Sequence, residues 1–278
     1  MRLKAPLPAG RTLESVTRHF ELESSIAARL KRSTRLERAA IYRTMYAELF
    51  AAVPDHPRLV RRASESDTAR DNRTKLGLLA PFLERSTRLA EIGAGDGRFA
   101  IELCARAAHV VAIDIADQLG PVERPANFEL VVYDGFEFPL APGSIDLAFS
   151  DQLLEHLHPD DVELHFASLL RALAPGGTYV LRTPHRHGGP HDVSRYFQDE
   201  PAGFHLKEWT FAELARVAEL AGFARVDAYV LRDDRLRAVA RGSIERLERF
   251  AARLPRALRR KLARRWYRNI VLACHAAR

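Results

Sequence analysis

The 278-residue sequence predicts a doubly wound α/β sheet, with a helical cap in front of it and a helical insert near its end. From residue 89 onward, short apolar runs alternate with helical patterns, which indicates strands joined by helices. The first runs lack the strict alternation of a half-exposed strand, as expected of buried parallel strands. The composition, 47% hydrophobic and 28% charged, is ordinary for a globular chain and excludes a mostly disordered protein or a collagen. With two cysteines, a disulfide scaffold is excluded as well.

Residues 1–70 are predicted to form the helical cap. Within them, residues 12–52 form a single helix in this interpretation, because Ile41, Met45 and Leu49 repeat every four positions. The helix is expected to end before the two prolines that follow closely in the sequence.

The remaining residues, 71–278, are predicted to form the α/β domain. A Ser-, Asp- and Arg-rich linker at 63–73 and a short helix at 76–83 lead into it. Seven strands are expected, and in chain order they are Leu89–Ile92, Val110–Asp114, Phe128–Val132, Ile145–Ser150, Thr178–Thr183, Ala224–Leu231 and Asn269–Cys274.

Charge is distributed unevenly along the chain. The net charge of +7 divides into +7 for residues 1–80, −11 for 81–231 and +11 for 232–278. Residues 232–268 lie between the last two predicted strands, and their amphipathic pattern predicts a basic helical insert. Such asymmetry favours an anionic partner for the flanking segments, and an anionic membrane surface is one candidate for the insert. Simple packing of the insert as a lid is the alternative.

The strongest motif is a glycine-rich loop after the first predicted strand, Glu91-Ile-Gly-Ala-Gly-Asp-Gly97. Gly93, Gly95 and Gly97 allow a tight turn and a close approach of the backbone to a ligand. The spacing is G-x-G-x-G rather than the G-x-G-x-x-G of dinucleotide folds, and Glu91 would repel a pyrophosphate. A ligand with a positive amino or sulfonium group is favoured there.

Acidic residues end the next two predicted strands. Asp114 follows Gly95 by 19 residues, where a carboxylate accepts hydrogen bonds from ribose hydroxyls. Asp134 and Gly135 end the third strand and suit an adenine amino group. Adenine, ribose and a cationic tail without phosphates together describe S-adenosylmethionine.

With these residues the chain resembles class I S-adenosylmethionine-dependent methyltransferases. The resemblance covers about residues 76–231. It includes Phe149-Ser-Asp-Gln-Leu-Leu-Glu-His156 after the fourth strand and Leu173-Ala-Pro-Gly-Gly-Thr-Tyr-Val180 before the fifth. It implies a Rossmann-like sheet of seven strands in the order 3-2-1-4-5-7-6, with the seventh strand antiparallel.

The same resemblance implies roles for four acids. Glu91 would hold the methionine amino group through water, Asp114 the ribose and Asp134 the adenine, while Asp151 would lie beside the methionine moiety. Gly93, Gly95, Gly97 and Gly135 would complete the cofactor site.

The loop after the fifth predicted strand carries the acceptor candidates, because ligands bind at the carboxyl ends of strands in open α/β sheets. The catalytic candidates there are His191, as a base, and Asp192, as the acid that orients it. His185, Arg195 and Tyr196 are the substrate-binding candidates. The loop reads Gly-Pro-His-Asp-Val-Ser-Arg-Tyr-Phe and is similar to that of uncharacterised bacterial methyltransferases.

A second constellation raises the question of a metal. Glu155 and His156, taken with His205, look like the divalent-metal set of small-RNA 3′-terminal 2′-O-methyltransferases. That set begins with a further carboxylate, where this chain has the neutral Gln152. Because hard cations prefer charged oxygen ligands, no metal is assigned. His156 is then a catalytic candidate and His205 a substrate-binding candidate.

The sequence therefore predicts an adenosylmethionine-dependent enzyme that methylates an oxygen of a small molecule, a sugar or a lipid-linked glycan. An RNA 2′-O-methyltransferase is the alternative enzyme, although no recognisable module predicts nucleic-acid binding. A catalytically inactive adenosylmethionine-binding subunit is the alternative from a different class. The N-terminus lacks an apolar signal segment, so the chain is expected in the cytoplasm, with the insert on the inner membrane face if it binds lipid. The acceptor and the oligomeric state stay open.

Overall fold

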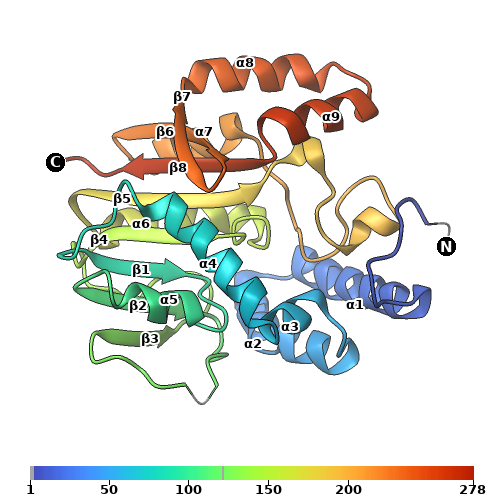
Figure 1. Ribbon diagram of the computed structural model, residues 1–278, viewed down its shortest axis with the longest axis horizontal. Coiled ribbons are helices and arrows are strands. Elements are labelled where there is room, and N and C mark those ends of the chain that lie inside the picture. The colour runs from blue at the N-terminus through green and yellow to red at the C-terminus, as the bar shows by residue number, and fades with distance from the viewer. Residues whose placement is uncertain (1–2, 121) are drawn as a thin grey trace.

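The computed structural model describes residues 3–120 and 122–278, and it confirms the doubly wound α/β sheet (Figure 1). The first two residues of the predicted cap lie outside the described residues. The strands are β1 (Arg88–Ile92), β2 (His109–Asp114), β3 (Phe128–Val132), β4 (Ile145–Asp151), β5 (Leu173–Pro184), β6 (Arg225–Arg232), β7 (Arg235–Val239) and β8 (Asn269–His275). They form one sheet in the order β3-β2-β1-β4-β5-β8-β6-β7.

The sheet has the expected order with one added strand at its edge. Strands β1 to β5 pair in parallel, and β8, the predicted seventh strand, runs antiparallel between β5 and β6. The added strand β7 pairs with β6 through a turn at Asp233 and Asp234, whose φ angles are 51° and 53°. Two successive left-handed residues are what a tight hairpin turn requires. The sequence prediction missed this hairpin because its arginine-rich edge strand looks like part of a basic insert.

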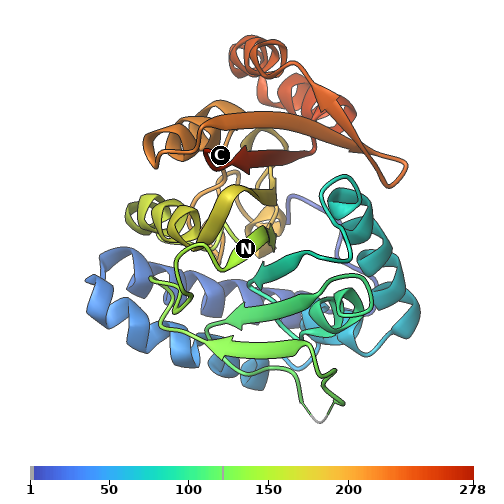
Figure 2. The same cartoon turned by 90° about the vertical axis from the view of Figure 1, so that its left-hand side faces the viewer.

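Helices cover both faces of the sheet (Figure 2). The helices α4 (Glu65–Leu79) and α5 (Arg98–Leu103) bury Leu78, Leu79 and Phe99 on one face. The helices α6 (Val162–Ala172) and α7 (Phe211–Leu220) cover the other face. Three 3-10 turns, η1 (Pro159–Asp161), η2 (Arg186–Gly188) and η3 (Val193–Tyr196), shape the loops at the carboxyl ends of β4 and β5.

The N-terminal cap differs in two ways from the expected single helix and linker. The helix divides into α1 (Leu13–Arg32) and α2 (Arg35–Ala52), because Thr34 and Glu37 form a capping box that starts a second helix. The segment 63–73 is helical rather than a linker: α3 (Pro57–Arg62) precedes it, and Ser64 caps α4, which runs through the proposed boundary at residue 70.

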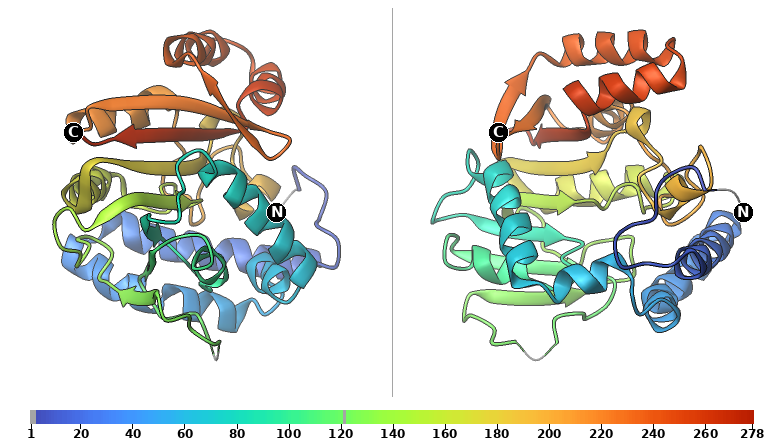
Figure 3. Two further views of the ribbon diagram at one scale, coloured as in Figure 1. Left: turned by 60° about the vertical axis from the view of Figure 1, so that its left-hand side comes forward. Right: turned by 45° about the vertical axis from the view of Figure 1, so that its right-hand side comes forward.

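The cap lies beyond the carboxyl ends of the parallel strands (Figure 3). Buried residues of α1 and α2 pack against Phe204 and Leu206, which lie in the loop before α7. A second cluster joins Val16 and Phe20 of α1 to Val193 and Phe197. The cap is therefore packed onto the loops where the sequence predicts the acceptor site.

The insert continues after β7 with two helices, α8 (Arg241–Ala252) and α9 (Arg256–Trp266). Helix α8 packs on α7, whereas α9 buries Ala263 alone and runs beside η2. Phe250, Leu258 and Trp266 are more than half exposed, at 54%, 54% and 52%. In the part of the chain that the structure describes, no helix is long and apolar enough to cross a lipid bilayer.

Candidate active site

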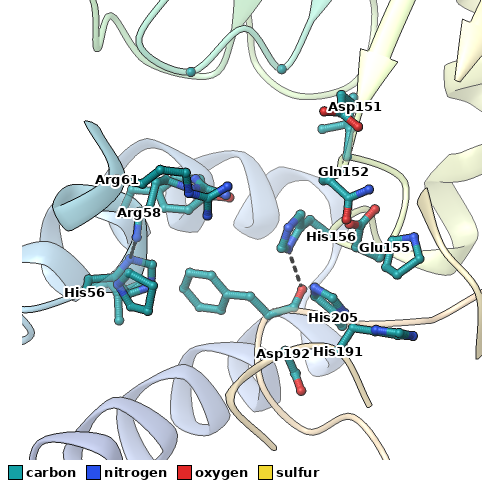
Figure 4. Close-up of a pocket in the computed structure, with 18 of the residues that line it drawn as sticks. His56, Arg58, Arg61, Asp151, Gln152, Glu155, His156, His191, Asp192 and His205 are labelled. Carbon is teal, nitrogen blue, oxygen red and sulfur yellow. Dashed lines mark hydrogen bonds between the residues drawn. The ribbon is translucent and has the colours of Figure 1, made fainter. Parts of the chain in front are cut away.

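A cavity of about 860 Å³ lies between the carboxyl ends of the strands and the cap. Its walls include the glycine-rich loop, the end of β2, the segment after β4, the loop after β5 and residues of α1 to α4 (Figure 4). Small-molecule sites typically measure about 300–1,000 Å³, so the cavity has room for a cofactor and a small acceptor.

The glycine-rich loop turns through left-handed backbone conformations. Gly93, Gly95 and Gly97 have φ angles of 73°, 61° and 67°, and the first two line the cavity. Gly97 caps α5, and a Cβ on it would lie 2.8 Å from Cγ of Leu119. The loop shape therefore requires glycine both for its backbone and for its packing.

Asp114 is fixed at the end of β2 by backbone donors. Its Oδ2 accepts the N–H of Gly95 at 2.7 Å, and its Oδ1 accepts that of Ile115 at 2.8 Å. Burial raises the pKa of this carboxyl group, although these hydrogen bonds oppose the effect. A carboxylate has about four acceptor sites, so capacity remains for ribose hydroxyls.

Glu91 is a buried acid with a free acceptor atom. It is 2% exposed, and its Oε2 has no hydrogen-bond partner among the described residues. Burial raises the pKa of Glu91 to about 7, although Lys75, whose Nζ lies 3.7 Å from Oε1, lowers it. A buried unpaired acceptor is costly unless a donor reaches it. Together with Asp114 and the glycine loop, Glu91 fits the cationic tail and ribose of adenosylmethionine.

Asp151 lines the cavity but already has a cationic partner. Its two carboxylate oxygens accept hydrogen bonds from Nε and Nη2 of Arg182, each at 2.6 Å. Burial alone would raise the pKa of Asp151, and the Arg182 charge lowers it below its ordinary value. The sequence analysis missed Arg182 and Lys75; a lone charge within the apolar run of β5 was the available signal for Arg182.

Asp134 and Gly135 lie differently at the end of β3. Gly135 lines the cavity, and Tyr42 of the cap packs so closely that a Cβ on Gly135 would lie 2.7 Å from its ring. Asp134 is exposed outside the cavity wall, and its Oδ1 accepts the N–H of Phe136 at 3.0 Å. Its adenine-binding role stays a prediction.

Glu155, His156 and His205 come together at one side of the cavity, with ligand atoms within 4.8 Å of one another. Nδ1 of His156 lies 3.0 Å from the carbonyl oxygen of Phe204, and Nδ1 of His205 lies 2.9 Å from Oε1 of Glu208. Burial lowers the pKa of His156 to about 3. Burial would also lower the pKa of His205, but the Glu208 hydrogen bond raises it to about 9. Burial raises the pKa of Glu155 to about 7.

His191 and Asp192 both line the cavity, but no hydrogen bond joins them within residues 3–120 and 122–278. Nε2 of His191 donates instead to the carbonyl oxygen of His185 at 3.0 Å. Asp192 accepts the N–H groups of Ser194 and Gly203, both at 3.0 Å. The prediction that Asp192 orients His191 is therefore wrong for this structure. Asp192 instead holds the backbone of its own loop.

Of the three predicted substrate-binding residues of this loop, two line the cavity and one lies in the core. Arg195 and Tyr196 line the cavity, with the Arg195 guanidinium 5.4 Å from the centre of the Tyr196 ring. His185 is fully buried outside the cavity wall, and its Nε2 contacts Glu248 of α8. It therefore joins the insert to the core, and a direct contact with substrate would need a different side-chain position.

The cap supplies basic residues that the sequence analysis did not single out. Arg58 and Arg61 of α3 point into the cavity opposite Gln152 and His156 (Figure 4). The guanidinium of Arg58 lies 4.9 Å from the centre of the Tyr46 ring. Their spacing of three residues after a helix-starting proline was the available signal.

A buried network ties the cap to the acceptor side. Oε1 of Glu23 accepts Nε2 of His19 at 2.8 Å, and Nε2 of His56 lies 3.8 Å from it. Oε2 of Glu23 accepts the N–H of Phe204 at 3.1 Å. Burial alone would raise the pKa of Glu23, but the hydrogen bond from His19 and the nearby His56 ring hold it far below its ordinary value.

Residues 90–181 match the family model described as "Methyltransferase domain". Phosphoethanolamine N-methyltransferase 1 of Triticum aestivum is 30% identical over 124 residues, which are 42% of this chain and 25% of that protein. A probable S-adenosylmethionine-dependent methyltransferase of Mycolicibacterium smegmatis is 29% identical over 136 residues, 48% of this chain and 50% of that protein. The chain thus spans between a quarter and a half of these relatives.

Among solved structures, the putative methyltransferase bound to the Haloferax volcanii Trm112 activator has the same fold. Its TM-score is 0.56 at 17% identity, over 76% of this chain and 92% of that chain.

Proposed function

We propose that the chain is an S-adenosylmethionine-dependent methyltransferase that methylates a hydroxyl oxygen of a small anionic acceptor, with sugars and lipid-linked glycans as candidates; the match of residues 90–181 to the methyltransferase family model supports the class of reaction. The observation that carries this proposal is the shared cavity. Asp114 lines its cofactor side, Glu91 is buried beside it next to the lining residue Lys75, and His191 lines its acceptor side, so the cofactor and the acceptor are proposed to share one space. Proximity of this kind supplies much of the rate in a direct displacement.

The charge of the cavity supports an anionic acceptor. Arg58, Arg61 and Arg195 line it, and among the described residues none of the three pairs with a carboxylate. Arg182 and Arg62, by contrast, pair with Asp151 and Asp96. Guanidinium groups without a carboxylate partner suit a phosphate or carboxylate of the acceptor.

The acceptor hydroxyl needs a base to become a competent nucleophile. Adenosylmethionine supplies an electrophilic methyl group, whose S–C bond breaks as the new C–O bond forms, with the electron pair remaining on sulfur. Because Nε2 of His191 donates to a carbonyl oxygen, its Nδ1 carries the lone pair. Burial lowers the pKa of His191, so the ring is neutral near pH 7 and can accept the hydroxyl proton.

The test is incubation with adenosylmethionine labelled in the methyl group and fractionated cell extract. Label is expected in a water-soluble or lipid-linked glycan fraction. His191→Asn should lower the turnover by about 100-fold and leave the affinity for S-adenosylhomocysteine unchanged. His187→Asn is the matched control, since His187 belongs to the same loop but lies outside this cavity. Label in RNA alone, or full activity of His191→Asn, would overturn the proposal.

Arginine substitutions test the acceptor charge separately. Arg61→Gln should raise the KM for the acceptor by about 10-fold, whereas Arg43→Gln, an exposed change on α2 away from the cavity, should not. Equal KM values for both variants would contradict the proposal that the acceptor is anionic. They would not contradict the proposed methyl transfer.

The insert supports a second proposal, that α8 and α9 bind an anionic lipid surface. Three large apolar side chains, Phe250, Leu258 and Trp266, are exposed among the arginines of these helices. Such helices bind anionic bilayers through apolar burial and charge. Vesicles containing phosphatidylglycerol should bind the chain at low salt, and Leu258→Ser should weaken this binding. Failure of these vesicles to bind would exclude the lipid partner.

A further inference from the structure

We propose that a second cavity, between α9 and the loop after β5, binds the phosphate group of a ligand. Its volume is about 300 Å³, and no residue of α9 lines the larger cavity that holds the candidate active site. Its walls come mainly from residues 186–190 and 199–201 of the loop and from Arg256, Arg259 and Arg260 of α9. Figure 1 shows α9 beside this loop. The basic insert therefore closes a cavity against the segment that leads to the active site.

The three arginines of α9 share one face of the helix. Arg256, Arg259 and Arg260 occupy positions i, i+3 and i+4, which are neighbours on a helix surface. Nη2 of Arg256 donates to the carbonyl oxygen of Asp199 at 2.7 Å, and its guanidinium also pairs with the Asp199 carboxylate. This contact fixes the start of α9 against the loop, so the cavity is formed before any ligand binds.

Arg259 and Arg260 point their charges into a wall that gives them no partner. Their Nε atoms are buried and lack a hydrogen-bond acceptor among the described residues. Neither guanidinium pairs with a carboxylate in the part of the chain that the structure describes, in contrast to Arg256. A buried donor without an acceptor is costly. An oxyanion in the cavity would supply the missing acceptors to both arginines.

The arginines also crowd one another. Burial lowers the pKa of Arg260, and the charges of Arg256, Arg264 and Arg195 lower it further, although Asp199 opposes them. Arginine stays protonated in proteins, so the crowding leaves a repulsion that a negative ligand would relieve. A phosphate group carries about 1.5–2 negative charges near pH 7 and matches the planar fork of a guanidinium. Phosphate therefore suits this cavity better than a single carboxylate.

The remaining acids of the wall do not neutralise the two arginines. Besides the carboxylate that pairs with the first arginine of α9, the wall contains Glu200 and Glu208. Glu200 is exposed, and Oε1 of Glu208 accepts the N–H of His191 at 2.6 Å. The residues that follow in the loop, from His191 to Tyr196, line the active-site cavity. A phosphate group bound to α9 would thus hold the insert against the loop that carries the proposed base. Its binding does not require methyl transfer.

Calorimetric titration of the full chain with inorganic phosphate tests the site. Arg259→Gln and Arg260→Gln should each weaken phosphate binding by at least about 10-fold, because each removes a charge-assisted hydrogen bond. Arg259→Lys should lose less, since lysine keeps the charge without the bidentate fork. Arg253→Gln is the matched control, an exposed change just before α9 and outside the cavity, and should retain wild-type affinity.

A second control separates this site from the active-site cavity, which has arginines of its own. Arg61 lines the active-site cavity only, so Arg61→Gln should retain the phosphate binding that Arg259→Gln loses. If Arg61→Gln abolished all phosphate binding while Arg259→Gln kept it, the second site would be excluded and the anionic acceptor of the proposed function would be supported.

Two further arms identify the source of the phosphate group. Competition by glycerol 3-phosphate would indicate a soluble phosphomonoester. Vesicles containing phosphatidic acid that bind Arg253→Gln but not Arg259→Gln would indicate a lipid headgroup.

Thermal melting shows whether each variant folds, and the substitution at Arg260 repeats the test if the one at Arg259 does not fold. Absence of phosphate binding by the wild type with a Kd of about 1 mM or below would overturn the site. Equal phosphate affinities of the folded Arg259→Gln, Arg260→Gln and Arg253→Gln variants would overturn it as well.

Discussion

The two sides of the cavity are built in different ways. Most of the predicted cofactor side comes from one continuous stretch, in which the glycine loop, β2 and the end of β3 follow one another within residues 91–135, and Asp151 at the end of β4 completes it. The acceptor side combines the segment after β4, the loop after β5 and helices of the N-terminal cap. Local chain geometry fixes the first side, whereas tertiary packing such as the Glu23–Phe204 contact fixes the second.

This difference predicts that substitutions on the two sides separate cofactor binding from acceptor chemistry. Cofactor residues should change the affinity for adenosylmethionine directly. Cap residues should act through the stability and position of the loops on which they pack.

The largest effect is expected at Asp114. Asp114→Ala removes the carboxylate that the ends of β2 and the glycine loop hold in place. The loss of two charge-assisted hydrogen bonds to ribose should weaken S-adenosylhomocysteine binding by at least about 100-fold, or roughly 3 kcal/mol. Asp192→Asn, on the acceptor side, should leave this affinity unchanged in the same calorimetric experiment. Similar losses of S-adenosylhomocysteine affinity in both variants would contradict the separation of cofactor binding from acceptor chemistry.

A glycine pair measures how tightly the cofactor loop is packed. Gly97 and Gly120 share a φ angle of 67°, but a Cβ on Gly97 would lie 2.8 Å from Leu119, whereas Gly120 has open space. Gly120→Ala should lower the free energy of unfolding by about 1 kcal/mol through backbone strain. Gly97→Ala should lower it by about 2–4 kcal/mol, because overpacking is added. Equal losses of unfolding free energy for the two variants, measured by urea unfolding, would show that the loop around Gly97 moves to accommodate the added Cβ.

Glu23→Gln tests the network of the cap. Because the folded pKa of Glu23 is depressed, its carboxylate stabilises the fold above its unfolded pKa of about 4.3, and this stability is lost as the pH falls toward the folded value. At pH 7 the variant should lose about 1–2 kcal/mol of unfolding free energy. The difference from wild type should shrink below about pH 4. A difference that is constant from pH 7 to pH 3 would count against an ionised Glu23.

The smallest effect is expected at the contact between the two sides. Nη2 of Arg62 donates to Oε1 of Gln118 at 3.0 Å, and Nε lies 3.5 Å from Asp96 in the glycine loop. Because the Arg62 side chain is partly exposed, Arg62→Gln should weaken S-adenosylhomocysteine binding by only about 3-fold. A 100-fold loss would mean that the cap is part of the cofactor site.

The sequence predicted the strands and the glycine loop because strand periodicity and glycine spacing are local signals, whereas the sheet order came from the resemblance to class I methyltransferases. It did not separate α1 from α2, although the Thr34–Glu37 capping box was readable. It also missed the β6–β7 hairpin, whose Asp233–Asp234 turn lacks the usual glycine. These two errors came from reading apolar periodicity without capping and turn chemistry.

The same division applies to the residues of the candidate site. Asp114 lines the cavity and Glu91 is buried beside it, and their ligand-binding roles stay predictions. His185 faces the core, because Glu248, 63 residues later, pairs with it. Arg58 and Arg61 reach the cavity through folding of the cap; their spacing after Pro57 indicates one helix face but not what that face lies against. Contacts between distant segments were beyond what spacing could predict.

A crystal structure of the chain with S-adenosylhomocysteine tests the central claim most directly. The account predicts the ribose hydroxyls on the Asp114 carboxylate, the methionine amino group near Oε2 of Glu91, and the sulfur facing the side of the cavity that holds His191. Ordered ligand elsewhere on the molecule, or well-ordered crystals grown at saturating ligand with the glycine loop unliganded, would contradict it.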